Sequence, residues 1–337
     1  MSIMSPITII ITTYQRPQLL KRAILSALNQ TWKYVQVWVL DDASGDETGR
    51  VVEEIAVTDS RVRYECHSPR KGMLQNYQYG LDHVETEYFT FLSDDDFLLP
   101  WYCETVMELM ETHPEIAFAA ASVACISEKN KVISIPLDGW PRKGVYYSEE
   151  GVRSMLGKIP IPNTICFRKC FVGAANIDFE NQPVWDWDFI LQLAGQFPFA
   201  ISKKVSGFLI AHPNSFTIQT SRKTICLAYL RLVERVKRFN FLSEALRDQV
   251  VAYYEREYFG RSLKFLVEER SFREARDHLQ VLLRSARGTE YCLFFLLSIW
   301  IRIPGVRNWI SPLRKFHLAI KSLMQRSINQ YLLSWEQ

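Results

Sequence analysis

Short apolar runs alternate with amphipathic stretches along the first two-thirds of the chain. Residues 6–12, 35–40 and 88–93 are rich in β-branched and aromatic side chains, a composition typical of buried strands. Apolar residues at helical spacing follow the first of these runs, and Pro17 suits the first turn of that helix. Strands that alternate with helices through short connections predict a mostly parallel, Rossmann-like sheet flanked by helices, which is an α/β fold.

The same patterns extend this prediction along the chain. Further strands are expected at residues 61–66, 116–123, 164–167 and 205–210, and further helices at residues 71–81, 101–112 and in the later part of 184–193. Residues 129–162 are instead rich in Gly, Pro and turn-forming residues, which favours a meander or a mobile flap over a site. No GxGxxG follows the first strand, so the dinucleotide-binding fingerprint is absent.

The character of the chain changes after Ser221, where long helical patterns begin. We therefore predict a domain at residues 1–221 and a basic helical extension at 222–337. The extension holds 21 Lys and Arg against 11 Asp and Glu, whereas residues 1–221 hold 19 against 26. From Tyr291 onward, basic residues interleave with apolar and aromatic ones, a pattern that suits peripheral contact with an anionic membrane. The alternative is that these helices pack on the first domain.

The cysteines and the N-terminus bear on the compartment. Seven scattered cysteines form no CxxC pair, and the first apolar run is too short and lacks the basic flank of a signal peptide. Both observations favour the reducing cytoplasm, with the inner face of the cell membrane as the place of any peripheral contact.

Two acidic clusters end apolar strands. Asp94, Asp95 and Asp96 follow residues 88–93, and Asp41 and Asp42 end the second strand. In an open α/β sheet, ligands bind outside the carboxyl ends of the strands. Adjacent carboxylates in such a place require a compensating cation, and oxygen ligands suit Mg²⁺ or Mn²⁺. A solvated acidic turn is the structural alternative.

Four segments, in this order, resemble glycosyltransferase family 2. They are Thr12-Thr13-Tyr14-Gln15-Arg16-Pro17, Asn29-Gln30-Thr31, residues 40–48 from Leu40-Asp41-Asp42, and residues 92–100 from Leu92-Ser93-Asp94 to Pro100. The resemblance covers residues 5–215. It implies the GT-A fold and a nucleotide-diphosphate sugar as the donor, with no nucleic acid as a partner.

The resemblance assigns the nucleotide-sugar site. Thr12, Tyr14 and Arg16 would line the base and ribose, and Asp94 would contribute from the acidic turn. Asp42 would accept a hydrogen bond from the base, with Asp41 in support.

The resemblance also assigns the metal site, for Mn²⁺ or Mg²⁺. Counting back from Pro100 makes Asp95 the best-matched ligand, with Asp94 and Asp96 on either side of it; Asp94 and Asp96 could instead form the pair. His212 matches a late histidine that meets the metal or the diphosphate. Ser93 departs from the family pattern, which has an acid there.

Trp185-Asp186-Trp187-Asp188 matches the place of the family's catalytic base. That role falls on Asp186, and Asp188 is the alternative, although its position favours a helix-surface acid. Trp185 and Trp187 would bind the acceptor, and their apolar rings would raise the pKa of Asp186 by desolvation.

These assignments predict an inverting, metal-dependent glycosyltransferase of the hexosyltransferase type. The expected donor is a UDP-sugar and the expected acceptor a glycan or lipid-linked hydroxyl, in the synthesis of a cell-surface polysaccharide. A catalytically degenerate GT-A domain that acts as a binding or scaffold protein is the alternative, which Ser93 and Trp185 favour. A nucleotidyltransferase would need a Gly-rich loop after the first strand, and residues 13–17 contain no glycine.

Overall fold

The structure is a computed structural model that describes residues 5–268 and 279–280. The chain divides into two compact units: residues up to Ser221 together with Phe239–Leu246, and residues 222–238 together with those from 247 onward. The division into domains at residues 1–221 and 222–337 stays a prediction, because most of the chain beyond residue 268 lies outside the described residues.

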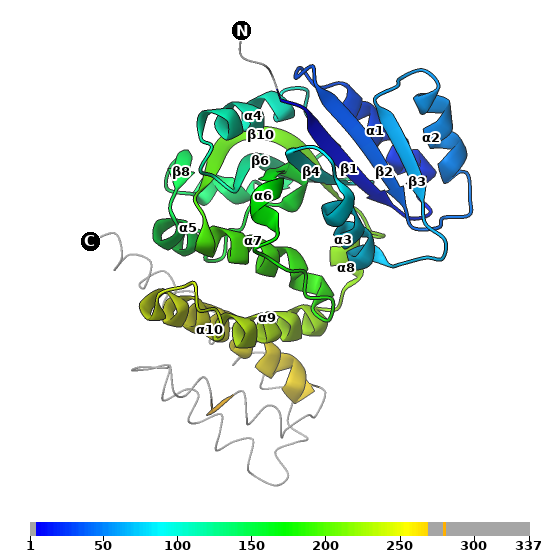
Figure 1. The fold of residues 1–337 in the computed structure, drawn as a ribbon. Coiled ribbons are helices and arrows are strands. Elements are labelled where there is room, and N and C mark those ends of the chain that lie inside the picture. Colours follow the sequence, from blue (N-terminus) through cyan, green and yellow to red (C-terminus); the bar gives the residue numbers. More distant parts are fainter. Residues whose placement is uncertain (1–4, 269–278, 281–337) are drawn as a thin grey trace. The chain divides into compact units, whose positions relative to one another are not determined.

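A ten-stranded mixed sheet forms the centre of the first unit (Figure 1). Its main path runs β3-β2-β1-β4-β9-β6-β10-β5, while β7 pairs with β6 and β8 with β10. The bounds are β1 Ile7–Thr13, β2 Val35–Asp41, β3 Val62–Cys66, β4 Tyr88–Ser93, β5 Phe97–Leu98, β6 Phe118–Ser127, β7 Val132–Ser134, β8 Gly144–Tyr146, β9 Ile165–Arg168 and β10 Phe199–Ala211.

The long strands all run in one direction. β1, β2, β3 and β4 pair in parallel, and β10 pairs in parallel with β6. The short β9 lies antiparallel to both β4 and β6, so those two strands also point the same way. The carboxyl ends of β1, β2, β4, β6 and β10 therefore lie at one edge of the sheet.

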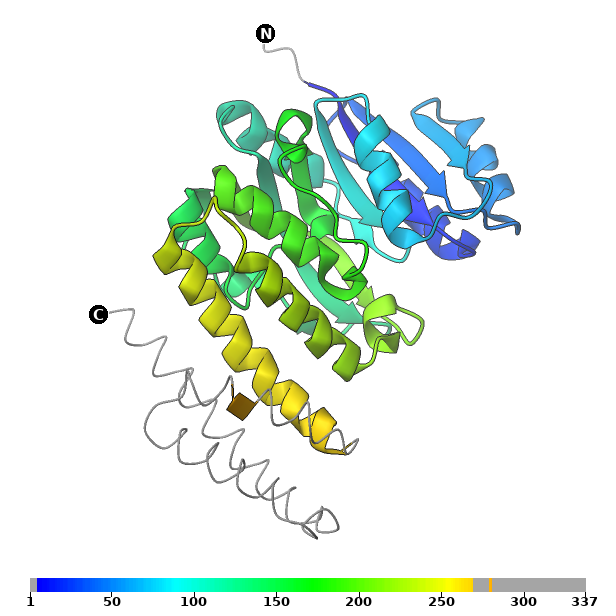
Figure 2. The ribbon, with the colours of Figure 1, turned by 60° about the horizontal axis from the view of Figure 1, so that its bottom comes forward.

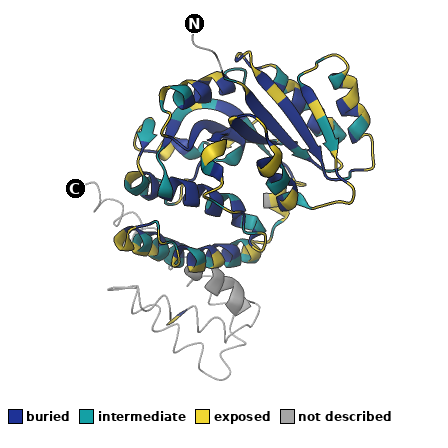
Figure 3. Cartoon of the chain, viewed as in Figure 1, coloured by how far each residue is buried: buried dark blue, intermediate teal, exposed yellow. Residues whose placement is uncertain are grey.

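Helices cover both faces of the sheet. One face packs against α1 Pro17–Leu28, α2 Thr48–Ala56 and α4 Tyr102–Thr112. The other face packs against α3 Met73–His83 and α7 Trp185–Gln196, where the rings of Phe167 and Phe189 lie 5.9 Å apart. Gly80 lets α3 approach closely, because a Cβ there would lie 3.1 Å from the Phe91 ring. Figure 3 shows the strands of this sheet as the most buried part of the unit.

The predicted α/β fold is confirmed. Residues 129–162, whose composition favoured a meander or a mobile flap, form β7, a 3₁₀ turn at Pro136–Gly139, β8 and the helix α5 Ser148–Met155. They bury Trp140 and Tyr146, whose rings pack edge to face. Short elements also appear at Pro162–Thr164, α6 Lys169–Val172, Gln182–Val184 and α8 Phe216–Gln219.

The second unit contains α9 Arg222–Val236 and most of α10 Glu244–Glu268 (Figure 2). The Tyr229 ring stacks on that of Tyr258 at 3.8 Å, and Lys237 forms an ion pair with Glu255 at 2.9 Å. None of the helices within residues 5–268 combines the length and the apolar character that a membrane span requires. The basic, aromatic-rich segment after Tyr291 lies outside the described residues.

Candidate active site

An acidic turn, Asp94–Asp96, joins β4 to β5 at the carboxyl edge of the sheet. The two-residue β5 then pairs antiparallel with Gly207 and Phe208 of β10, which brings the turn to the end of β10. All three carboxylates are buried, at 5%, 9% and 4% exposure for Asp94, Asp95 and Asp96. Three adjacent acids held away from water need positive or hydrogen-bonding partners, and each finds different ones.

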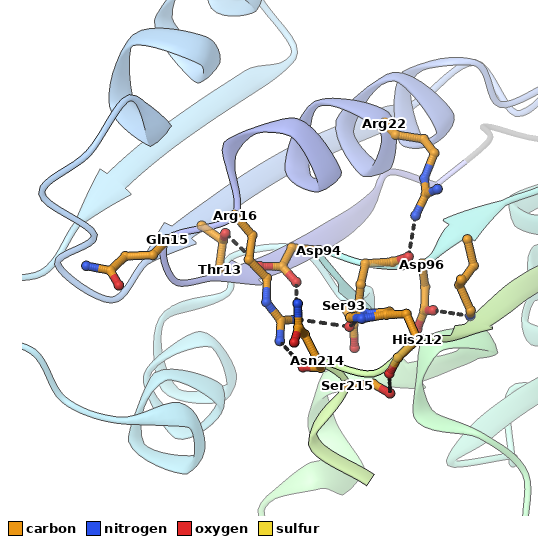
Figure 4. A network of polar contacts seen from close by, with 12 residues as sticks. Thr13, Gln15, Arg16, Arg22, Ser93, Asp94, Asp96, His212, Asn214 and Ser215 are labelled. Atoms are coloured by element: carbon orange, nitrogen blue, oxygen red, sulfur yellow. Dashed lines mark hydrogen bonds and ion pairs between the residues drawn. The ribbon is translucent and has the colours of Figure 1, made fainter. Parts of the chain in front are cut away.

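Asp94 turns toward β1 and the loop that follows it (Figure 4). Its Oδ2 accepts a hydrogen bond from the Thr13 hydroxyl at 2.8 Å, and its Oδ1 lies 3.1 Å from Arg16 Nη1. Burial, and then the neighbouring charge of Asp95, raise the pKa of Asp94 to about 6, against the lowering effect of Arg16 and Thr13.

Asp95 lies between Arg16 and His212. Its Oδ2 lies 2.9 Å from Arg16 Nη1 and 3.0 Å from His212 Nε2. Its backbone carbonyl accepts a hydrogen bond from Arg22 on α1. His212 comes directly after β10 and is buried, so residues more than a hundred positions apart meet at this carboxylate.

Asp96 turns the other way, toward β10. Its Oδ1 accepts a hydrogen bond from the Ile210 amide at 2.8 Å, and its Oδ2 accepts one from the side-chain amide of Asn163. Burial, and then the charge of Asp95, raise its pKa well above the ordinary value. The Ser93 hydroxyl donates to Asn163 Oδ1 at 3.3 Å, so the residue that replaces the family's acid belongs to this network.

The second acidic pair, Asp41 and Asp42, lies at the end of β2, two strands from the turn. Asp41 accepts hydrogen bonds from Ser44 and from the Tyr64 hydroxyl, the latter at 2.7 Å. The carboxylate of Asp42 accepts hydrogen bonds from the backbone amides of Lys71, at 2.7 Å, and Gly72, at 2.9 Å. Gly72 has φ +91°, a conformation that favours glycine.

Arg70 joins Tyr14 to Asp42. Its guanidinium lies 3.6 Å from the centroid of the Tyr14 ring, and its Nε donates to Asp42 Oδ2 at 3.2 Å. The aromatic ring and the carboxylate that the sequence assigned to the base are therefore close neighbours here. Arg16, assigned to the same base, instead reaches the acidic turn.

Tyr77 on α3 connects the acidic turn to the start of α7. Burial raises the pKa of its hydroxyl, against the lowering effect of the nearby Thr12 and Ser93 hydroxyls. Its ring lies 4.7 Å from that of Trp185. Trp185 is only 9% exposed, so its ring packs against Tyr77 and presents little surface to an acceptor. Its acceptor-binding role stays a prediction, as does that of the half-buried Trp187.

Asp186 lies in the first turn of α7 and is half-buried. Its Oδ1 accepts a hydrogen bond from the Trp187 amide at 2.9 Å. Desolvation nevertheless raises the pKa of Asp186 to about 6, in the direction expected from its tryptophan neighbours. Asp188 is completely buried and accepts a hydrogen bond from Gln192 at 3.1 Å, so the expectation of a helix-surface acid was wrong.

The metal assignment can be tested against the donor atoms. Within residues 5–268 and 279–280, no three His, Cys, Asp or Glu side chains are grouped as a metal cage. Asp95 Oδ2 and His212 Nε2 are 3.0 Å apart, close to the spacing of adjacent ligands of one octahedral ion with bonds of about 2.1 Å. Such ions are commonly held by one or two side chains and completed by substrate phosphates. The residues therefore fit a divalent ion shared with a diphosphate.

Several residues of this site carried no signal in the sequence. Asn163 lies in the 3₁₀ turn Pro162–Thr164 and Arg70 in a loop, both outside any motif, and Tyr77 and Arg22 look like ordinary helix residues. Only the spatial arrangement reveals that they contact the acids or their neighbours.

The mixed α/β sheet, with helices on both faces, is a sheet of the GT-A fold. The crystal structure of S. aureus TarS residues 1–349 with UDP-GlcNAc superposes with a TM-score of 0.69 at 14% identity, covering 92% of each chain. Mannosyltransferase PcManGT from Pyrobaculum calidifontis, with GDP-Man and Mn²⁺, gives 0.52 at 12% identity over 91% of this chain and 84% of that one.

Sequence comparison identifies the family. Residues 8–167 match the profile of glycosyl transferase family 2. Over 333 residues the chain is 26% identical to the GalNAc(5)-diNAcBac-PP-undecaprenol beta-1,3-glucosyltransferase of Campylobacter jejuni, covering 94% of this chain and 99% of that protein. Residues 8–167 therefore form a glycosyltransferase family 2 domain, and the chain is a glycosyltransferase.

Proposed function

We propose that this enzyme transfers a hexose from a UDP-sugar to a hydroxyl group of a lipid-linked glycan, with inversion at the anomeric carbon and with a divalent cation. The donor class is supported by the UDP-GlcNAc bound to TarS, and the acceptor class by the name of the Campylobacter relative. The observation that carries the proposal is the convergence of Asp95 and His212 at one edge of the sheet, with Asp186 linked to it through Trp185 and Tyr77.

The donor would lie along the carboxyl edge of the sheet. Tyr14, Arg70 and Asp42 offer an aromatic face, a cation and an acceptor oxygen for the base and ribose. Asp95 and His212 would hold Mn²⁺ or Mg²⁺, with Asp94 and Asp96 on either side. When bound, that ion supplies charge stabilisation for the departing diphosphate.

Asp186 would act as the general base. Its carboxylate would take the proton of the acceptor hydroxyl while the oxygen attacks the anomeric carbon and the bond to the diphosphate oxygen breaks. Attack from the side opposite the leaving group inverts the configuration. A pKa of about 6 leaves Asp186 mostly ionised at neutral pH, yet more basic than an ordinary aspartate.

The acceptor would be met at the cytoplasmic face of the membrane. A lipid-linked substrate places the enzyme near a bilayer, and the excess of basic residues after residue 222 suits an anionic surface. Truncation after Leu283 should remove binding to anionic liposomes and leave donor hydrolysis intact; equal partitioning of the two proteins would contradict the membrane role.

Donor hydrolysis tests the catalytic proposal directly. We expect release of UDP from at least one member of a panel of UDP-sugars in the presence of Mn²⁺, and a loss of about a hundredfold or more in Asp95→Asn. Asp138→Asn, at an exposed acid outside the site, is the matched control and should keep full activity. A wild-type protein that hydrolyses no UDP-, GDP- or dTDP-sugar would favour the binding or scaffold role instead.

A further inference from the structure

A single guanidinium joins two of the three buried acids. Arg16 Nη1 lies 3.1 Å from Asp94 Oδ1 and 2.9 Å from Asp95 Oδ2. The other terminal nitrogen, Nη2, donates to the backbone carbonyl of Asn214 at 2.8 Å. Figure 4 shows Arg16 between the acidic turn and the segment after His212. We call this arrangement, Arg16 with Asp94 and Asp95, the arginine bridge.

The arginine bridge uses an oxygen that the metal would need. Asp95 Oδ2 is the atom that lies 3.0 Å from His212 Nε2, and Arg16 Nη1 shares it. An ion bonded to this oxygen carries two positive charges and would repel a guanidinium that shares its ligand. The Arg16 side chain is 32% exposed, so it has access to solvent on one side and can withdraw.

We propose that Arg16 is an internal substitute for the divalent cation. Without the ion, the arginine bridge compensates the charges of Asp94 and Asp95; when the ion binds, Nη1 leaves the carboxylates and donates to the diphosphate beside the ion. This inference rests on the proposed function, because it needs a cation and a diphosphate at this site. It gives Arg16 a positioning role that couples the two binding events.

The chemistry of the groups supports the exchange. An arginine fork suits phosphate oxygens as well as carboxylates, and its donors stay charged throughout. The contact of Nη2 with Asn214 holds the guanidinium near the site while Nη1 changes partners. Because the ion must displace Nη1, Arg16 opposes the binding of the ion alone and favours the binding of the diphosphate once the ion is present.

The exchange predicts effects of opposite sign in Arg16→Gln. We expect the full-length variant to bind Mn²⁺ alone about tenfold more tightly than the wild type, because the competitor is gone. With Mn²⁺ saturating, it should bind UDP about tenfold more weakly, because the donor to the diphosphate is lost. Free Mn²⁺ measured by electron paramagnetic resonance gives the first quantity, and titration calorimetry with UDP gives the second.

Arg22→Gln is the matched control. It removes the same charge from a position on α1 near the acids, but Arg22 contacts the backbone carbonyl of Asp95 rather than a carboxylate, so its loss frees no ligand oxygen. Its affinity for Mn²⁺ alone should rise clearly less than that of Arg16→Gln, by about twofold at most. Arg16→Lys keeps the charge and a single nitrogen that could contact both carboxylates, as Nη1 does, so its affinity for Mn²⁺ alone should lie closer to that of the wild type than to that of Arg16→Gln. Circular dichroism verifies that each variant is folded.

Two other results would overturn the exchange. Unchanged Mn²⁺ affinity in Arg16→Gln would mean that arginine and ion coexist, and weaker affinity for both Mn²⁺ and UDP would mean that Arg16 only supports the local structure. If neither wild type nor variant binds Mn²⁺, with or without UDP, the metal dependence of the proposed function fails as well. That outcome differs from the first two, in which the wild type binds the ion normally.

Discussion

Replacing Asp186 by asparagine should raise the stability of the protein at neutral pH while it removes most of the transfer activity. The pKa of Asp186 is about 6 in the folded chain, against 3.8 for an ordinary aspartate, and the main cause is desolvation. At about 1.4 kcal/mol for each tenfold change in proton affinity, this difference corresponds to about 3 kcal/mol. Because the side chain is only half-buried, water screens part of the cost, and we expect about 1–2 kcal/mol.

The sign follows from which state holds the proton. Below pH 3.8 the carboxyl is protonated in both states, and burial carries no charge penalty. As pH rises toward 6, the unfolded chain ionises first, so the folded protein loses stability until the penalty is complete above about pH 6. Asparagine mimics the protonated form at every pH. Asp186→Asn should therefore raise the melting temperature by about 2–6 °C at pH 8, by about half as much at pH 5 and by almost nothing below about pH 3.8.

Activity supplies the second half of this test. In the wild type, the rate of transfer should rise with pH with an apparent pKa of about 6. Asp186→Asn should lower kcat by about a hundredfold or more and remove this rise, with little change in the KM for the donor. If Asp188→Asn removed the rise and Asp186→Asn kept it, the base would be Asp188. A variant that is less stable than the wild type at pH 8 would refute the desolvation argument.

Three further predictions concern the surroundings of the acids. Gly72→Ala should cost about 1–2 kcal/mol in urea unfolding and weaken UDP binding, because φ is +91° at the amide that holds Asp42; Gly173→Ala, with open space around its Cα, should be nearly neutral. Asn163→Leu should lower the free energy of unfolding by about 2–3 kcal/mol, because the buried Asp96 loses the side-chain amide that donates to its Oδ2. A variant as stable as the wild type would argue against that contact. Removal of divalent ions by a chelator should abolish donor hydrolysis, and Mn²⁺ should restore it; activity that persists would exclude metal dependence.

The hydrophobic pattern predicted the first half of the sheet well, because its strands are continuous apolar runs. β1, β2 and β4 appear within a residue or so of the expected bounds. β10 begins at Phe199, whereas the pattern placed a strand only from residue 205. Its register against β6 shifts between Ser202 and Gly207, and the polar Lys203 and Lys204 lie in this irregular stretch. A bulge breaks the two-residue alternation on which strand prediction depends.

The direction of β9 could not be predicted. Residues 164–167 are a short apolar fragment, which indicates a strand and says nothing about its orientation. In the structure β9 enters the sheet antiparallel between β4 and β6, and it follows directly on the turn that holds Asn163 against Asp96. The contact of Asn163 with Asp96 therefore depends on the antiparallel placement of β9, which is fixed only when the whole sheet assembles.

Some residues of the candidate site could be predicted from the sequence and others could not. Acids at strand ends are visible in the sequence, and the family motifs point to His212 and Asp186. Arg70 carried no such signal, since its contact with Tyr14 depends on the path of the loop before α3. The acceptor-binding role expected of Trp185 was inferred from the chemistry of its ring, and in the structure that ring is buried and packs against Tyr77 and Phe189.

The formal charges around the acidic turn give a reason why Ser93 stands where the family pattern has an acid. The three buried acids face two arginines, Arg16 at the carboxylates and Arg22 beside them, which leaves one negative charge uncompensated. The raised pKa values of Asp94 and Asp96 reflect this deficit together with their burial. If a divalent ion takes the place of Arg16, the charges balance. A fourth acid at position 93 would restore the deficit, whereas a serine that donates to Asn163 keeps the balance and still orients Asp96. If the proposed ion binds there, Ser93 suits the charge of the site, and its presence alone does not favour the binding or scaffold role.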